Sequence, residues 1–249
     1  MSDPVVETKH LTKLYGEQTA VRDLSLIVER GEVFGFLGHN GAGKTTTIHM
    51  LTTLLKPTSG SASICGKSVT EQSLEVRRHI GYVPENVRLY DTMTARNNLR
   101  FFARLSGVVN PDRRIDETLE FLDCAALAPR LVGSFSKGLR QRIGLAQAIL
   151  HRPDVLFLDE PTSGLDPMGI KTLRDLIVRL NREFGTTIFM NTHLISEISR
   201  TCTSIGVLNQ GELVFRDTIE KVTERYGNDS SLEELYLSVT PVKAQAVSP

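Results

Sequence analysis

The segment GEVFGFLGHNGAGKT at residues 31–45 decides how the chain is expected to fold. Its first half is an apolar run bounded by glycines, which predicts a short strand buried on both faces. Its second half, GHNGAGKT at residues 38–45, matches the phosphate-binding pattern G-x-x-x-x-G-K-[ST]. Such a loop joins a strand to a helix, and we expect the helix to begin at Lys44. A chance glycine-rich turn is the alternative, and the predicted strand and helix argue against it.

This loop carries the residue types that binding a triphosphate requires. Glycines let the backbone curl so that several N–H groups converge on phosphate oxygens. The positive end of the following helix adds to the attraction. Lys44 can reach the β and γ oxygens, and the Thr45 hydroxyl can ligate Mg²⁺. The remaining predicted ATP-binding residues are Gly38, His39 (through its backbone rather than its ring), Asn40, Gly41, Ala42, Gly43 and Thr46.

A second apolar run, VLFLDE, ends in two adjacent carboxylates, Asp159 and Glu160. Taken alone, a strand that ends in acids is more often a solvated edge. Beside a phosphate-binding loop, Asp159 is expected to hold Mg²⁺, directly or through water. Glu160 lies one residue further, where it can polarise a water molecule for attack on the γ-phosphate.

The composition is that of an ordinary globular protein. The 29 lysines and arginines balance 29 aspartates and glutamates, so a basic surplus for nucleic acid is missing and no nucleic-acid partner is expected. The three cysteines form no CxxC pair and predict buried thiols rather than a disulfide or zinc site. His10, His49, His79 and His151 show no metal spacing and are expected to be structural.

Neither a membrane span nor a signal peptide is apparent in the sequence. No apolar stretch approaches the roughly 20 residues that cross a bilayer. The first residues, MSDPVVETKH, lack the basic-then-apolar pattern of a secretory signal. We therefore expect a cytoplasmic chain that reaches a membrane only through a partner.

Short apolar runs alternate with longer segments of helical period, which predicts an α/β fold. Between about residues 92 and 150 the pattern becomes helical, and two expected helix faces contain Leu99, Phe102, Ala103 and Leu105, then Ile115, Leu119 and Leu122. Residues 231–249 are expected to form a short helix and a disordered tail. The strands are expected at residues 20–29, 31–38, 61–65, 80–83, 155–159, 186–190, 204–209 and 212–217.

The class of phosphate-binding protein depends on a third motif. The guanine-reading pattern [NT]-K-x-D of GTPases does not occur, and small-molecule kinases do not explain FSKGLRQR at residues 135–142. That string, just before the acidic strand, resembles the signature LSGGQ-x-QR of the ABC ATPase family. The resemblance runs from about Val5 to Asp217, and the motifs follow the family's order.

The resemblance implies a P-loop NTPase (RecA-like) core with an N-terminal antiparallel β subdomain and an inserted α-helical subdomain. One ATPase domain would span residues 1–230, with the helical insert at about 86–150. The family pairs two ATPase subunits head to tail, as a homodimer or with a related chain. Ser136 and Gly138 of one subunit would then bind the ATP of the other.

Three further positions acquire expected roles from the resemblance. Tyr15 matches the aromatic residue that stacks on adenine; without the family match it would read as a half-exposed tyrosine in a turn. His193, in MNTHL, matches the switch histidine that reaches the γ-phosphate and is expected to act in catalysis with Glu160. SGLD at residues 163–166 matches the loop that couples the two nucleotide sites.

The chain departs from the family pattern at three positions. Glu85, in IGYVPEN, replaces the usual glutamine; it keeps an oxygen for metal or water and adds a charge. Lys137 and Leu139 replace a glycine and a glutamine of the signature, and Lys137 either approaches the opposite γ-phosphate or faces solvent. These variants look like the branch that drives multidrug, lipid and polysaccharide exporters with separate membrane subunits.

The expected function is therefore an ATP-hydrolysing exporter motor at the cytoplasmic face of a membrane. A soluble ABC ATPase of a non-transport assembly, such as cofactor assembly, is the alternative. A catalytically inactive regulatory subunit is a third alternative. Such a subunit would lack motif residues, but Lys44, Asp159, Glu160 and His193 are all present here. The surface expected to meet the membrane subunit is residues 86–104, with candidate apolar contacts Val87, Leu89, Tyr90 and Met93.

Overall fold

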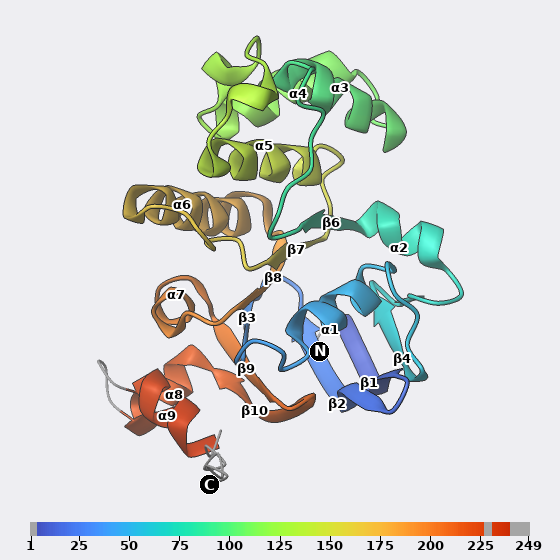
Figure 1. Ribbon diagram of the computed structural model, residues 1–249, viewed down its shortest axis with the longest axis vertical. Coiled ribbons are helices and arrows are strands. Elements are labelled where there is room, and N and C mark those ends of the chain that lie inside the picture. Colours follow the sequence, from blue (N-terminus) through green and yellow to red (C-terminus); the bar gives the residue numbers. More distant parts are fainter. Residues whose placement is uncertain (1–3, 227–230, 240–249) are drawn as a thin grey trace, which may run out of the picture.

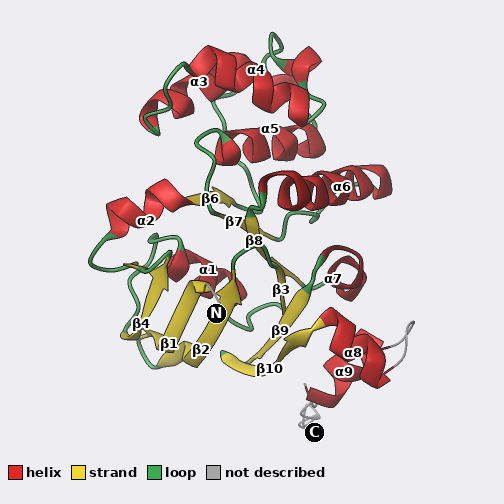
Figure 2. Ribbon diagram, turned by 180° about the vertical axis from the view of Figure 1, so that it is seen from behind, coloured by secondary structure: helices red, strands yellow, loops and turns green. Residues whose placement is uncertain are grey.

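The computed structural model describes residues 4–226 and 231–239; the predicted disordered tail at 240–249 lies outside them. Within the described residues the strands form two sheets, both coloured yellow in Figure 2. A cap of helices lies at one end of the molecule and two C-terminal helices lie at the other (Figure 1).

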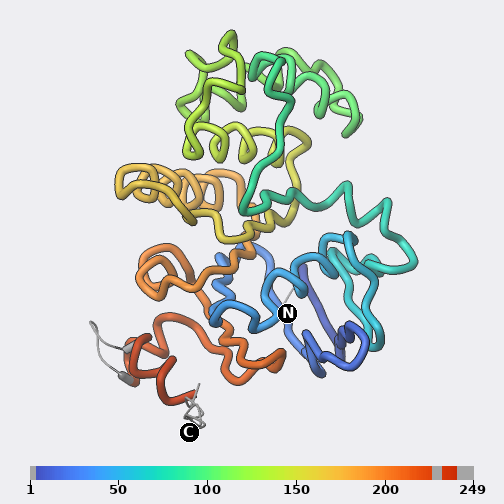
Figure 3. The backbone as a smooth tube through the Cα atoms, in the orientation of Figure 1, coloured from blue at the N-terminus to red at the C-terminus, as the bar shows by residue number. Residues whose placement is uncertain are grey.

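The larger sheet has the strand order β10-β9-β3-β8-β7-β6. Strands β9, β3, β8, β7 and β6 are parallel, and β10 joins the edge antiparallel to β9. Figure 3 shows that segments far apart in the sequence, coloured blue and orange, are neighbours in this sheet. The strands are β3 (Val33–Leu37), β6 (Ile80–Val83), β7 (Val155–Asp159), β8 (Thr187–Thr192), β9 (Ser204–Asn209) and β10 (Glu212–Thr218).

The register of the parallel strands brings three chain segments to one edge of this sheet. Leu37, the last residue of β3, pairs with Thr192, and Asp159 at the end of β7 pairs with Asn191 of β8. The loop from β3 to the helix α1 (Lys44–Leu51) therefore begins beside the ends of β7 and β8. The carboxyl edge of a parallel sheet is where α/β proteins commonly bind ligands.

The smaller sheet is antiparallel and has the order β2-β1-β4-β5. In β2, Leu24, Leu26 and Val28 are buried against the core and alternate with exposed residues, as expected for a sheet with one covered face. Its strands are β1 (Pro4–Tyr15), β2 (Gln18–Glu29), β4 (Ser59–Ile64) and β5 (Lys67–Ser68).

The helical segment expected after residue 92 lies between β6 and β7. Leu99 and Ala103 are fully buried, but Leu105, expected on the same face, is 75% exposed at the helix end. The helices of this segment are α3 (Ala95–Leu105), α4 (Pro111–Phe121) and α5 (Lys137–Ile149), with single turns η1 (Ala125–Leu127) and η2 (Val132–Ser134).

The two faces of the large sheet are covered by two hydrophobic cores. Phe34 and Phe36 of β3 point into the core shared with α1 and the antiparallel sheet. Val33 and Leu37 point the other way, into a second core that includes buried residues of the helical segment. This alternation buries both faces of the strand and fixes the start of the phosphate-binding loop.

The remaining helices complete the covering layers. They are α2 (Ser73–His79), α6 (Pro167–Phe184), α7 (Ile195–Thr201), α8 (Ile219–Tyr226) and α9 (Ser231–Val239), the last being the predicted C-terminal helix. Among the described residues, a helix with the length and apolar character of a membrane span is not found.

Candidate active site

The phosphate-binding loop needs glycine at two positions because other chain segments pass close to it. A Cβ atom on Gly43 would lie 2.3 Å from the carbonyl oxygen of Ala20, and Gly43 also has a φ of +105°. A Cβ atom on Gly38 would lie 2.6 Å from the carbonyl oxygen of Leu208. Both contacts are shorter than van der Waals distance, so side chains here would displace the loop.

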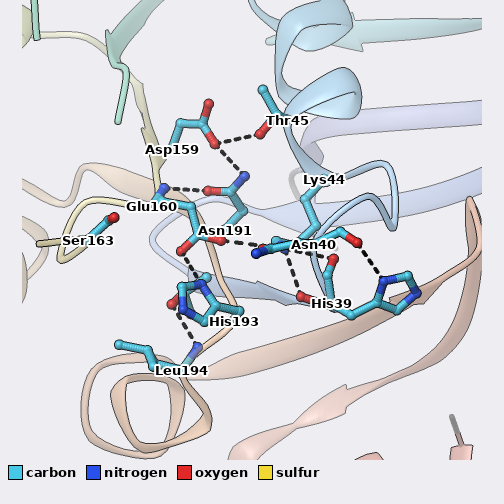
Figure 4. A network of polar contacts seen from close by, with 12 residues as sticks. His39, Asn40, Lys44, Thr45, Asp159, Glu160, Ser163, Asn191, His193 and Leu194 are labelled. Atoms are coloured by element: carbon cyan, nitrogen blue, oxygen red, sulfur yellow. Dashed lines mark hydrogen bonds and ion pairs between the residues drawn. The ribbon is translucent and has the colours of Figure 1, made fainter. Parts of the chain in front are cut away.

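Lys44 is the first residue of α1, as predicted, and only 6% of its surface is exposed. Its Nζ donates to the carbonyl oxygens of Gly38 (2.7 Å) and His39 (3.2 Å), so the loop wraps around the ammonium group. The same Nζ lies 3.4 Å from the Glu160 carboxylate (Figure 4). The lysine is therefore held in position, with its charge compensated, at the centre of the loop.

The acidic pair at the end of β7 separates into two environments. Asp159 is buried, and its Oδ1 accepts hydrogen bonds from Thr45 Oγ1 (2.9 Å) and Asn191 Nδ2 (2.6 Å). Hydroxyl and carboxylate oxygens are the hard donors that Mg²⁺ prefers, so Thr45 and Asp159 fit such an ion. The predicted metal residues Thr45 and Asp159 thus lie side by side.

The other oxygen of Asp159 faces Tyr82 of β6. The Tyr82 hydroxyl donates to Asp159 Oδ2 at 3.4 Å and lies 3.2 Å from His49 Nε2. Burial, reinforced by the Asp159 charge, raises the pKa of Tyr82 well above its usual range. The hydroxyl therefore stays protonated and orients the Asp159 carboxylate.

Glu160 forms the second half of the acidic pair and points toward the loop and His193. Its Oε2 lies 2.9 Å from His193 Nδ1, and its Oε1 faces Lys44. The backbone of Glu160 has a φ of +46°, unusual for a residue with a side chain. Its N–H donates to the side-chain oxygen of Asn191 at 2.7 Å, which holds this turn in place.

A cavity of about 340 Å³ adjoins Lys44, Thr45 and Glu160. Tyr15, at the end of β1, lines the cavity and is 49% exposed, and Lys13 Nζ lies 5.3 Å from the centre of its ring. The other lining residues are Gln18, Ala20, Asn40, Gly41, Gly43, Lys44, Thr45, Thr46, Glu85 and Glu160.

Glu85 lines the same cavity, but its carboxylate is engaged elsewhere. Its Oε1 accepts a 2.8 Å hydrogen bond from the Ser163 hydroxyl, four residues after Asp159. Ser136 is the N-cap of α5, and its hydroxyl accepts from the N–H of Leu139. Ser136 and Gly138 are not among the described residues that line this cavity.

Two residues of the site were not predicted from the sequence. Asn191 bridges Asp159 and the Glu160 backbone, and Tyr82 orients Asp159 from the other side. Asn191 could have been found from its position two residues before His193, near the end of a buried strand. Tyr82 could be found only from the pairing of β6 with β7.

Comparison with known proteins decides the family of this chain. Residues 21–163 match the family described as ABC transporter. The chain belongs to the ABC transporter family. It is 43% identical over 225 residues to the bacitracin transport ATP-binding protein BcrA of Bacillus licheniformis, covering 89% of this chain and 73% of that protein.

Solved structures agree in fold. An ATP-binding subunit of an ABC transporter matches with a TM-score of 0.84 and 30% identity, covering 94% of this chain and 99% of that one. A dimeric ATP-binding cassette in a post-hydrolysis state, bound to ADP and Pi, matches with a TM-score of 0.78 and 27% identity, covering 86% and 98%. This ABC protein is an ATP-binding and ATP-hydrolysing transporter subunit, and the non-transport alternative gains no support.

Proposed function

We propose that this ABC protein is the motor of an exporter, in which Mg-ATP closes a pair of ATPase subunits on a separate membrane subunit. The observation that carries the proposal is the set of contacts joining Lys44, Glu160 and His193 beside the Thr45–Asp159 pair. One relative, BcrA, is named for bacitracin transport, and export of a comparable compound is our extension of that name.

In the proposed mechanism, Lys44 and the loop N–H groups hold the β and γ phosphates. Thr45 and Asp159 would hold Mg²⁺, which when bound neutralises charge on the phosphate oxygens. Glu160 accepts a proton from the attacking water as a general base, and His193 orients the Glu160 carboxylate. Tyr15 supplies the face on which adenine stacks.

The proposal requires a second ATPase subunit. Ser136 caps α5, so its hydroxyl and the Gly138 N–H lie at a helix N-terminus, where anions are favoured. Since neither residue lines the cavity described above, we propose that they serve the ATP of the paired subunit. One structurally similar ATP-binding cassette is dimeric, which supports the pairing of two subunits.

The proposed contact with the membrane subunit lies on the helical segment. Tyr90 is 47% exposed and Met93 is 37% exposed, whereas Val87 and Leu89 are partly buried against the core. The Tyr90 ring packs edge-on against Phe101. These exposed apolar groups form a patch of the kind that binds a protein partner. A shallow cavity of about 580 Å³ adjoins them, lined by Met93, Asn97, Arg100, Phe101, Arg104 and Leu105.

Tyr90→Glu is expected to release the chain from membranes that contain its co-expressed membrane subunit. A carboxylate in an apolar interface loses its hydration without gaining a partner. The measurement is co-sedimentation with membranes, together with ATP binding, which should be unchanged. Leu74→Glu is the matched control, because Leu74 is also exposed but lies on α2. Equal sedimentation of both variants would contradict this docking surface.

Glu85→Gln is expected to change turnover by about threefold or more while ATP affinity stays within about threefold. The reason is that Glu85 contacts Ser163, in the loop after the acidic pair, rather than the loop that holds phosphate. Glu85→Gln keeps an oxygen that can accept from the Ser163 hydroxyl and loses only the charge, whereas Ser163→Ala removes the hydrogen bond and should change turnover at least as much. A large loss of ATP binding in Glu85→Gln would instead make Glu85 a metal ligand.

A further inference from the structure

Three side chains with metal-binding atoms meet at the edge of the large sheet opposite the nucleotide cavity. One ligand atom each from Cys65, His79 and Asp154 lies within 4.8 Å of the other two. His79 Nδ1 lies 2.7 Å from Asp154 Oδ2. His79 ends α2 just before β6, and Asp154 immediately precedes β7, so both are at the amino ends of strands. The cluster is therefore separate from Asp159, at the carboxyl end of β7.

The backbone at Cys65 and Asp154 is held by hydrogen bonds to other segments, and His79 is the last residue of α2. The Cys65 N–H donates to the Val5 carbonyl at 2.8 Å, and Cys65 has a φ of +49° in the turn between β4 and β5. The Asp154 carbonyl accepts from the Thr187 N–H at 3.0 Å. The three side chains thus converge from elements whose positions the fold fixes, as a preformed ligand site requires.

The surroundings of Asp154 suit a ligating carboxylate. Arg30 Nη1 donates to Asp154 Oδ1 at 2.7 Å, which leaves Oδ2 directed at His79. A hydrogen bond to the second oxygen is the usual outer-shell support of a metal-binding carboxylate. The side chains of His79 and Asp154 are 34% and 33% exposed, so an ion can enter from solvent.

We propose that Cys65, His79 and Asp154 bind a divalent transition cation of the zinc class. A thiolate, an imidazole nitrogen and a carboxylate oxygen form a mixed donor set that suits Zn²⁺ and not Mg²⁺. On binding, the thiol releases its proton, and the imidazole binds as the tautomer that carries its proton on Nε2. Water completes the fourth position, and the bound ion joins the antiparallel sheet to the start of β7.

The site is tested on the purified, chelator-treated full chain without nucleotide. Calorimetric titration with Zn²⁺ is expected to give one site per chain, and Co²⁺ should give a thiolate-to-metal charge-transfer band. Cys65→Ser and His79→Gln should each weaken Zn²⁺ binding by at least about tenfold, since changes outside the ligand shell already cost that much. Zn²⁺ should also raise the melting temperature of the unmodified chain but not of these variants.

Two other histidine–carboxylate pairs provide controls. His10 contacts Asp23 on the surface without a cysteine, so His10→Ala should leave Zn²⁺ binding unchanged. His193 contacts Glu160 in the active site and is the competing location. Binding that survives Cys65→Ser but disappears in His193→Ala would overturn the proposal. The absence of a Co²⁺ charge-transfer band, or of Zn²⁺ binding at one ion per chain, would also overturn the proposal.

Discussion

Lys44→Ala is expected to lower the affinity for Mg-ATP at least about 100-fold, equivalent to about 2.8 kcal/mol. Lys44 is the cation at the centre of the phosphate-binding loop, and it lies between the loop carbonyls and Glu160. Without it, the phosphates would approach the Glu160 carboxylate with no buried ammonium group between them. Buried like charges repel strongly because water screens them poorly.

Calorimetry with Mg-ATP on the purified chain measures this loss, and ATP hydrolysis should fall with it. Lys171→Ala is the matched control, because Lys171 is an exposed lysine of α6 away from the loop. Circular dichroism should show both variants folded, since alanine fits the first turn of a helix well. An affinity within about threefold of the unmodified chain would contradict the proposed role of Lys44.

The parts of the site that could be predicted are those whose residues lie close together in the sequence. The pattern at residues 38–45 predicts a strand before the loop and a helix after it, and α1 begins at Lys44 as expected. The acidic pair follows an apolar run and therefore had to lie at the end of a buried strand, which is β7. Parallel pairing then brings both segments to one edge, because carboxyl ends of parallel strands coincide.

What the sequence could not predict depends on register between distant strands. Asn191 contacts Asp159 only because β7 and β8 pair residue 159 with residue 191. The strand expected at residues 186–190 extends to Thr192, so Asn191 lies inside β8. Cys65 and Asp154 likewise meet only after two sheets have packed together, which is why the spacing of cysteines and histidines indicated no metal site.

Glu160→Gln is expected to bind Mg-ATP but to hydrolyse it at least about 100-fold more slowly, the usual contribution of a general base. The amide keeps the shape of the carboxylate and an oxygen that can accept from Lys44 and His193. It cannot take a proton from water. An ATP-bound pair of subunits should therefore persist, and size-exclusion chromatography with Mg-ATP would detect it as a dimer. Glu183→Gln, an exposed change on α6, should hydrolyse normally.

Mixing two inactive variants tests whether each site is completed by the paired subunit. Ser136→Arg should lose hydrolysis because it blocks the helix N-terminus proposed to meet the partner's γ-phosphate. In a mixed pair, the Ser136→Arg chain supplies an intact Lys44 and Glu160, and the Glu160→Gln chain supplies an intact Ser136. One complete site is thereby rebuilt, so ATP hydrolysis should reappear on mixing. If Ser136 instead served the ATP of its own chain, every site in the mixture would lack one group, and the mixture would stay inactive.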